Sequence, residues 1–247
     1  SRESALSQIE TFFDCVHPII PIFDQSKINE ILLEVYQSLK SEKSVNALNV
    51  LLLMAIFFCS SYVAVASGVI PDLLLCNNYY KAYRYLLDIA EFPMRPLLES
   101  LQAFVVVNFV VDPNMVDATA YSAMLVRMGQ QLGLHKTPMD GANHIKLLWN
   151  FLLYIEGSSS VVCGFSFSTP SNLMDSVPLP DVTSSINSKF PILYTVGRCK
   201  INTVFRHVME LTSKRLLFRA DLDETERRIT KLYKDVCLIN HNLRCTK

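Results

Sequence analysis

The chain has 247 residues and a mass of 28.0 kDa, which suits one large domain or two small ones. Half of the residues are hydrophobic, only 19% are charged, and 23 basic side chains balance 23 acidic ones. This composition excludes a disordered chain, and it argues against a domain that grips nucleic acid by its phosphates, because such domains carry a basic excess. The seven glycines are too few for glycine-rich phosphate loops or a turn-dense β fold, so we expect a well-packed helical domain.

Two helices separated by prolines are expected at the start of the chain. Residues 4–16 carry apolar side chains at helical spacing, and Pro18 and Pro21 then break the pattern because proline cannot continue a helix. Ser26 is a favourable N-cap, and residues 27–40 repeat apolar side chains at the spacing of an amphipathic helix. Each of these helices should therefore bury one face.

The next segment stands out because no charged residue occurs from Ser44 to Pro71. Val45–Ser67 is long enough to cross a bilayer, which takes about 20 apolar residues. The alternative is a helix that is buried on all sides in an all-α domain. Polar residues such as Asn46 and Asn49 are scattered through the segment, and the neighbouring helices are amphipathic and need a shared core. We therefore favour the buried core helix and expect no membrane association.

The rest of the chain continues the helical pattern. Apolar spacing predicts helices over residues 77–91, 97–111, 115–134, 142–164, 192–219 and 223–243. Residues 165–191 are rich in serine and proline and lack periodicity, so they form the longest predicted loop and are where we expect any sub-boundary. The segments together predict an all-α fold, a multi-helix bundle of antiparallel helix pairs around the buried helix 45–67. We expect 1–247 to be a single helical domain, and the first residue, Ser1, suggests a fragment of a longer protein.

The cysteines predict neither a disulfide framework nor a metal site. Their number, seven, is odd and no C-x-x-C occurs, which is typical of buried thiols in a reducing compartment. Cys237, His241 and Cys245 are spaced by four on one predicted helix, so two of them could share a metal ion. The outer two lie about 12 Å apart along the helix axis, so one helix cannot supply all three ligands. We therefore expect no metal to bind this chain.

No sequence motif supports an enzyme. The segment Gly157–Val161 resembles a nucleophile elbow but lacks the second glycine and lies within a predicted helix. Neither a P-loop nor a G-x-G-x-x-G motif occurs, and no spacing marks a pair of carboxylates for acid–base catalysis. We therefore predict that the chain has no catalytic residues.

Two charged residues, Arg127 and Glu156, occur in apolar surroundings on successive predicted helices. An isolated charge in a protein interior is costly, so buried opposite charges usually pair. The alternative is that both side chains contact a ligand in a pocket. We favour a structural ion pair between Arg127 and Glu156 that joins the two helices, and we assign no ligand-binding residue.

Several motifs follow one another in order over residues 8–180. They are an aromatic, His-Pro and Pro-Ile series at Phe12–Phe23, a Leu-Gln-Ala helix at Leu101–Phe104, an Arg-Met to Leu-Gly-Leu-His run within Ala123–His135, a Trp-to-acidic series at Leu148–Glu156, and Val177–Pro180. This series resembles the regulatory middle homology domain of fungal zinc-cluster (Zn2Cys6) transcription factors. The chain departs from that family at Asn150, where a second tryptophan is usual, at Glu156, which replaces Asp, and at Gly164–Ser166, which replaces a Gly-Arg-Pro turn. A ligand site near that turn is therefore not carried over.

The resemblance implies an all-α domain of a nuclear transcription regulator. Such proteins carry a zinc-cluster DNA-binding domain, a dimerising coiled coil and an activation region, none of which is present in residues 1–247. Zinc and DNA are therefore expected only at the absent DNA-binding domain. The family has no catalytic residues, and some members bind small hydrophobic effectors. The partners that this implies are a small apolar effector, a second copy of the chain and a coactivator.

Two functions remain open at this point. One is an effector-sensing regulatory module of a sequence-specific RNA polymerase II transcription factor, and the other is a ligand-free helical scaffold for dimerisation or coactivator binding. An enzyme is a much weaker third hypothesis. A cavity with convergent polar groups would favour the sensor, and an exposed apolar patch would favour the scaffold.

Overall fold

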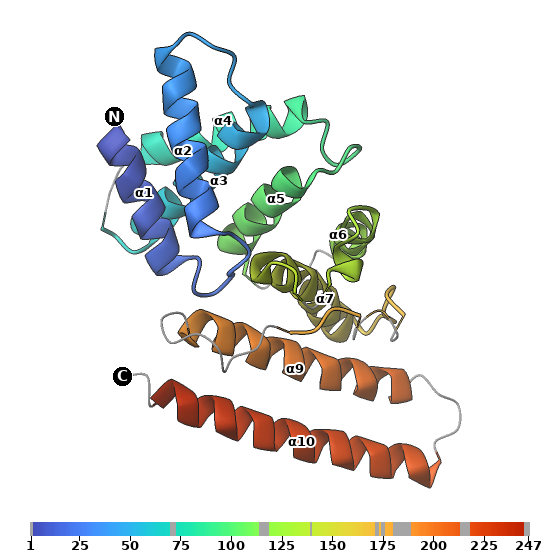
Figure 1. The fold of residues 1–247 in the computed structure, drawn as a ribbon. Coiled ribbons are helices and arrows are strands. Elements are labelled where there is room, and N and C mark those ends of the chain that lie inside the picture. Colours follow the sequence, from blue (N-terminus) through green and yellow to red (C-terminus); the bar gives the residue numbers. More distant parts are fainter. Residues whose placement is uncertain are drawn as a thin grey trace. The chain divides into compact units, whose positions relative to one another are not determined.

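The computed structural model describes residues 2–69, 73–113, 119–138, 140–170, 173, 176–179, 189–212 and 218–244. Those residues form α-helices and one short 3-10 helix without any strand (Figure 1), which confirms the all-α prediction. The chain divides into two compact units, Ser1–Asn114 and Met115–Lys247, which we call the first and second unit. This division lies well ahead of the loop 165–191, where we had expected a sub-boundary. That residues 1–247 act as a single regulatory domain stays a prediction.

The first unit is built around one apolar helix. Its helices are α1 (Arg2–Cys15), α2 (Gln25–Lys40), α3 (Ala47–Ala66), α4 (Leu73–Ile89) and α5 (Leu98–Val111). Helix α3 packs against the other four, and residues such as Leu51, Ala55 and Ile56 have no exposed surface, which confirms the buried central helix. Helix α3 is also long and apolar enough to cross a membrane, but most of it is buried by its neighbours. That the chain does not associate with membranes stays a prediction.

Side-chain caps decide where two helices of the first unit begin. The carboxylate of Asp24 accepts hydrogen bonds from the backbone N–H groups of Ser26 (2.9 Å) and Lys27 (3.3 Å). Asp24 is therefore the N-cap of α2, and the expected cap, Ser26, instead donates its hydroxyl to Asp24. The side chain of Asn46 accepts from the backbone N–H of Leu48 at 3.0 Å and starts α3. The polar residues that flank the apolar segment thus set its ends.

The second unit holds the remaining elements, α6 (Thr119–Gln131), the 3-10 helix η1 (Leu134–Lys136), α7 (Asn143–Cys163), α9 (Lys189–Thr212) and α10 (Arg219–Arg244). The helix expected over 115–134 ends early at Gln131. Gly133 adopts a left-handed backbone with φ of 74°, which glycine accepts at little cost and which ends an α-helix. Residues 115–118 lie outside the described residues.

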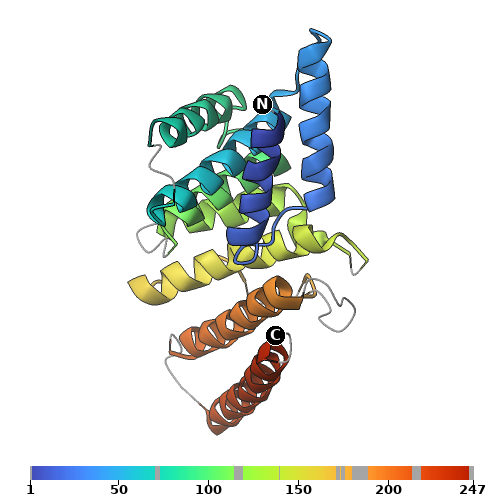
Figure 2. The same cartoon turned by 90° about the vertical axis from the view of Figure 1, so that its left-hand side faces the viewer.

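The contacts show how the helices of the second unit run. Ser122 of α6 meets Ser159 of α7, and Gly129 lies against Leu152, so α6 and α7 are antiparallel. Helices α9 and α10 are also antiparallel and lie side by side in both views (Figures 1 and 2). Helices α7 and α9 run in the same direction where they meet, as Arg198 lies over Tyr154 and Arg206 reaches Glu156. The long connection 164–188 makes this parallel pair possible. Within the second unit, the predicted antiparallel packing is therefore found for α6 with α7 and for α9 with α10, but not for α7 with α9.

Candidate functional site

The motifs of the first unit meet in one packed corner. The ring of His17 packs on Phe13 with centroids 4.7 Å apart, and its Nε2 lies 3.0 Å from the carbonyl oxygen of Phe23. Gln102, from the Leu-Gln-Ala helix α5, is buried and donates through Nε2 to the carbonyl oxygen of Ile22 at 2.6 Å. The His-Pro segment is an irregular loop whose buried carbonyl groups need donors. These two motifs therefore fix a loop to a helix.

The motifs of the second unit converge on Trp149, the single tryptophan of the chain. Trp149 is fully buried on α7 and packs against Gly129 of α6. A methyl group at Gly129 would approach the indole ring to 3.3 Å and Leu152 to 2.8 Å, so glycine allows this close contact. The ring of His135 lies 5.8 Å from the indole, centroid to centroid. The Leu-Gly-Leu-His run and the tryptophan series thus form one packing unit.

Glu156, further along α7, holds the segment that follows the helix. Its Oε1 accepts hydrogen bonds from the backbone N–H groups of Ser168 (2.7 Å) and Thr169 (3.0 Å) and from the Ser168 hydroxyl (2.5 Å). Its Oε2 accepts from the Thr169 hydroxyl at 2.6 Å. The start of the expected loop 165–191 is therefore tied to α7, which explains why the chain does not divide there.

The same carboxylate forms an ion pair with Arg206 of α9. Nη2 of Arg206 lies 2.5 Å from Oε2 of Glu156 and also donates to the carbonyl oxygen of Leu153 at 2.9 Å. Both charged side chains are almost completely buried, with exposed fractions of 1% and 2%. The guanidinium lies 4.4 Å from the centre of the Phe167 ring, where a cation is attracted to the π face. We call Glu156, Ser168, Thr169 and Arg206 the clasp, because together they join α7, the segment after it and α9.

The charge of Glu156 is maintained by its partners. Burial by itself would raise the pKa of this carboxyl, because it disfavours the charged form. The positive charge of Arg206 and the hydrogen bonds from Ser168 and Thr169 outweigh that effect and lower the pKa below its usual range. The carboxylate is therefore ionised at neutral pH and accepts every hydrogen bond that the clasp requires.

The clasp depends on a close approach of α7 and α9 next to it. Asn202 of α9 donates through Nδ2 to the carbonyl oxygen of Leu153 at 3.1 Å. A Cβ atom at Gly157 would lie only 1.8 Å from Oδ1 of Asn202. Glycine is therefore required for this helix contact, and the segment Gly157–Val161 serves packing, since Ser159 bonds Ser122 at 2.9 Å.

The prediction that Glu156 pairs with Arg127 is wrong. Arg127 is exposed on α6, and its Nη1 donates to the side chain of Gln130 at 3.0 Å. Glu156 is buried in an ion pair as expected, but the cation comes from α9, fifty residues along the chain. Helix α6 turns Arg127 to solvent, whereas α9 directs Arg206 at α7. Sequence proximity suggested the wrong partner.

One sequence signal could have identified Arg206. Cys199, Asn202 and Arg206 recur at the i, i+3 and i+7 spacing of one helix face, and all three are buried. This face contains polar and small residues, so apolar periodicity alone predicts that it is exposed to solvent. Polar periodicity opposite Gly157 and Ser160 would have indicated a buried polar contact between the helices.

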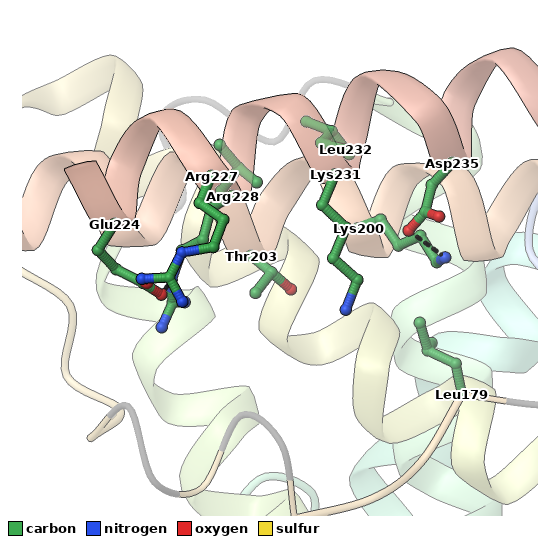
Figure 3. A pocket seen from close by; sticks show the side chains of 10 residues that line it. Leu179, Lys200, Thr203, Glu224, Arg227, Arg228, Lys231, Leu232 and Asp235 are labelled. Carbon is green, nitrogen blue, oxygen red and sulfur yellow. Dashed lines mark hydrogen bonds and ion pairs between the residues drawn. The ribbon is translucent and has the colours of Figure 1, made fainter. Parts of the chain in front are cut away.

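A groove between α9 and α10 is the second feature that could serve a function (Figure 3). Its cavity volume is about 570 Å³, and it is lined by the apolar Leu179, Val204 and Leu232, by Thr203, and by the charged Lys200, Glu224, Arg227, Arg228, Lys231 and Asp235. Lys200 pairs with Asp235 at 2.6 Å, and Glu224 pairs with both neighbouring arginines. Lys231 extends into the groove and forms no ion pair with any residue that the structure describes. The groove is therefore amphipathic, with four basic and two acidic side chains.

The structure shows which cysteine thiols are buried and whether side chains that could bind a metal ion come together. Cys59, Cys76 and Cys199 are buried, whereas Cys15, Cys163 and Cys237 are exposed, which corrects the expectation that the thiols are mostly buried. Burial raises the pKa of the Cys199 thiol to about 12. In the part of the chain that the structure describes, no three His, Cys, Asp or Glu side chains come together as a metal site. Cys245, one of the three residues considered for zinc, lies outside that part.

Comparison with known proteins identifies the family. Residues 9–194 match the fungal specific transcription factor domain, which spans three quarters of the chain and every motif described above, but not Arg206 or α10. No curated protein and no solved structure matches the chain. Because the family match covers well over half of the residues, the chain belongs to the fungal specific transcription factor domain family.

Proposed function

We propose that this regulatory region of a fungal transcription factor acts in the nucleus, where it controls RNA polymerase II transcription through a zinc-cluster DNA-binding domain outside residues 1–247. The family match over residues 9–194 is the observation that carries this proposal. The balanced charge of the chain agrees with it, because 23 basic and 23 acidic side chains leave no excess to displace phosphate counterions. The proposal assigns no catalytic step and no metal to this chain.

We further propose that the domain senses a small, largely apolar effector in the groove between α9 and α10. A volume of about 570 Å³ lies within the range of small-molecule sites. Leu179, Val204 and Leu232 would contact the apolar body of the ligand. Lys231 would attract an anionic end group, so the groove favours an amphipathic acid over a pure hydrocarbon.

The effector would act through the position of α10. Helix α10 contributes six of the ten residues that line the groove, and the ion pair between Lys200 and Asp235 links it to α9. A ligand that binds one arrangement of α9 and α10 more tightly than another shifts the population toward that arrangement. The regulatory signal would then be a change at the surface of this helix pair.

A reporter experiment tests the proposal. Residues 1–247 fused to an unrelated DNA-binding domain should change transcription of a reporter that carries the cognate sites, relative to that DNA-binding domain alone. Medium-chain and long-chain carboxylic acids should shift the reporter signal and raise the melting temperature of the purified chain, and Lys231→Glu should abolish both effects. The exposed Lys81→Glu on α4 is the matched control and should leave them unchanged. A fusion without any effect on transcription, or tight and salt-sensitive DNA binding by residues 1–247 alone, would contradict the proposal.

A further inference from the structure

Thr230 of α10 belongs to a basic sequence motif that occurs at one place in the chain. The run Arg227–Thr230 puts two arginines three and two residues before a hydroxyl group. No other serine or threonine of the chain has an arginine three residues before it. Kinases of the basophilic class recognise this arrangement, because carboxylates in their peptide groove pair with arginines at these positions. The motif therefore predicts a phosphate acceptor at Thr230.

Thr230 lies on the side of α10 that faces away from α9. Asp235 and Thr225 of α10 bond to Lys200 and His207 of α9, and Thr230 is rotated by roughly 140° from each of them around the helix axis. The residue is exposed, and its hydroxyl forms no hydrogen bond to any residue that the structure describes. The hydroxyl of Thr225, in contrast, donates to the backbone of its own helix at 2.7 Å. The acceptor oxygen of Thr230 is therefore accessible and unbonded within the described part of the chain.

Helix α10 can open locally at low cost, which lets a kinase bind the motif in an extended form. From residue 219 to residue 241, no side chain of this helix is buried. Segments with few buried apolar contacts have the lowest free energies of local opening. The neighbouring helix α9 does bury side chains, among them Leu193, Val196 and Arg206. The motif thus occurs on the helix of the second unit that is most easily opened.

The surface around Thr230 supplies cations for a phosphate group. Thr230 lies in an open depression whose lining residues are Asp223, Glu226, Arg227, Thr230, Lys231 and Lys234. Arg227 precedes Thr230 by three residues and Lys234 follows it by four, so both side chains lie on its side of the helix. Lys234 forms no ion pair with any residue in the described ranges. Arg227 pairs with Glu224, which Arg228 also holds, so Arg227 can turn to a phosphate without leaving Glu224 unpaired.

We propose that Thr230 is a phosphorylation site for a basophilic kinase, and that Arg227 and Lys234 hold the phosphate and strengthen α10. The hydroxyl oxygen of Thr230 attacks the γ-phosphorus of ATP, and the bond from that phosphorus to the oxygen bridging it to the β-phosphorus breaks. ADP leaves, and the hydroxyl proton passes to a carboxylate of the kinase. The product is a phosphate ester on the exposed side of the helix.

The phosphate reverses the charge of the depression. Three basic and two acidic side chains line it, and a phosphothreonine adds a charge of about −1.5 to −2 at neutral pH. Asp223 and Glu226 repel the phosphate, but charge-assisted hydrogen bonds to Arg227 and Lys234 outweigh this repulsion. These two contacts span more than one turn of α10, so they should make local opening of the helix less frequent.

Treatment of the full 247-residue chain with the catalytic subunit of cyclic-AMP-dependent protein kinase, Mg²⁺ and ATP tests the acceptor site. Mass spectrometry with peptide mapping should find phosphate on Thr230, and Thr230→Ala should remove it. Arg227→Ala should slow the incorporation about tenfold, because it removes the arginine that pairs with the kinase. Arg219→Ala is the matched control, since Arg219 is exposed on the same helix outside the motif, and circular dichroism should show equal helix content in all variants. No phosphate on Thr230, or equal rates for R227A and R219A, would overturn the proposal.

Hydrogen exchange of the α10 amide groups tests the contacts of the phosphate. Phosphorylation should slow exchange over residues 227–238 roughly threefold, which corresponds to two side-chain pairs on a helix surface. Lys234→Gln should remove most of this protection, whereas Glu226→Gln should increase it, because it removes a like charge four residues before the phosphate. Unchanged or faster exchange after phosphorylation, or equal effects of the two substitutions, would overturn the proposal. The effector proposed for the groove takes no part in either experiment, so the two proposals fail separately.

Discussion

The two units are stabilised by different chemistry. In the first unit, the buried polar residues are Ser60, Ser61, Ser100 and Gln102, and over its described residues no charged side chain is buried. In the second unit ten polar or charged residues are buried, among them Lys146, Glu156 and Arg206. Hydrophobic burial is non-directional and tolerates small adjustments, whereas a buried ion pair requires one geometry. The difference indicates that the arrangement of helices is more strictly specified in the second unit.

The two central helices make the contrast concrete. Helix α3 meets its neighbours mainly with aliphatic and aromatic side chains, and its buried Ser60 donates to the carbonyl oxygens of Ile56 on α3 and of Gln8 on α1. Helix α7 meets α9 through Glu156 and through the glycine that admits Asn202. A substitution in α3 should therefore cost stability in proportion to the volume removed. A substitution in the clasp should cost the desolvation of a charge left alone.

The largest effect is expected from breaking the clasp. Arg206→Met leaves the Glu156 carboxylate buried without its cation, which should lower the free energy of unfolding of the second unit by about 3–5 kcal/mol. Urea unfolding followed by the fluorescence of Trp149 reports on this unit, because this tryptophan lies on α7. Arg127→Met is the control and should change stability by less than about 0.5 kcal/mol, since Arg127 is exposed. Equal effects of the two substitutions would contradict the assignment.

A large-to-small substitution in α3 should affect the first unit alone. Ile56 has no exposed surface, so Ile56→Ala should cost about 2–5 kcal/mol and Ile56→Val about 0.5–1.5 kcal/mol. Hydrogen exchange of the α3 amide groups should accelerate, while the unfolding midpoint reported by Trp149 stays within error. If the Trp149 transition moved with the α3 amides, the two units would not differ in the way described.

Two mid-helix glycines of the second unit provide a matched pair. Gly157→Ala places a methyl group on Asn202 and should destabilise by about 1–3 kcal/mol, although alanine favours a helix. Gly197→Ala meets only the side chain of Ile239, at 3.7 Å, and should stabilise by up to about 1 kcal/mol. The urea midpoint followed by Trp149 measures both. A stabilising Gly157→Ala would show that α7 and α9 do not approach as closely as described.

The smallest expected effects are changes in the rate at which individual cysteine thiols are chemically labelled. Cys15, Cys163 and Cys237 are exposed and should react in the native chain, whereas Cys59 and Cys199 should react only when their unit opens. Burial raises the pKa of both buried thiols and so suppresses the reactive thiolate. Peptide mapping by mass spectrometry should show that Arg206→Met accelerates labelling of Cys199 and leaves Cys59 unchanged. Equal acceleration at both sites would remove the distinction between the units.

The sequence predicted the apolar architecture well. The absence of charge from Ser44 to Pro71 identified α3 as the central helix, and apolar periodicity located most ends of the described α-helices to within four residues. Helix α9 is an exception, because it ends at Thr212 and the pattern had predicted residue 219. Helix ends were less predictable, because Asp24 and Gly133 act through a cap and a left-handed backbone that periodicity does not capture. These features are local, so closer attention to capping residues could have found them.

The partner of Glu156 in the clasp could not be predicted from the sequence. Burial of Glu156 was expected because its neighbours are apolar, but the choice between Arg127 and Arg206 depends on how α6 and α9 are rotated relative to α7. That rotation follows from the parallel packing of α7 and α9, which in turn depends on the long connection between them. The groove likewise arises from the antiparallel pairing of α9 and α10, and all of its lining residues except Leu179 lie beyond the residues that match the family.

A double-mutant cycle between Glu156 and Arg206 tests the central distinction most directly. Glu156→Leu, Arg206→Met and the double variant are compared with the unaltered chain by urea unfolding of Trp149. The coupling energy should lie between about 1 and 3 kcal/mol, and the double variant should be more stable than the additive sum of the single losses predicts. The same cycle between Glu156 and Arg127 should give a coupling energy within about 0.5 kcal/mol of zero. A coupling energy near zero for Arg206, or a larger one for Arg127, would contradict the account.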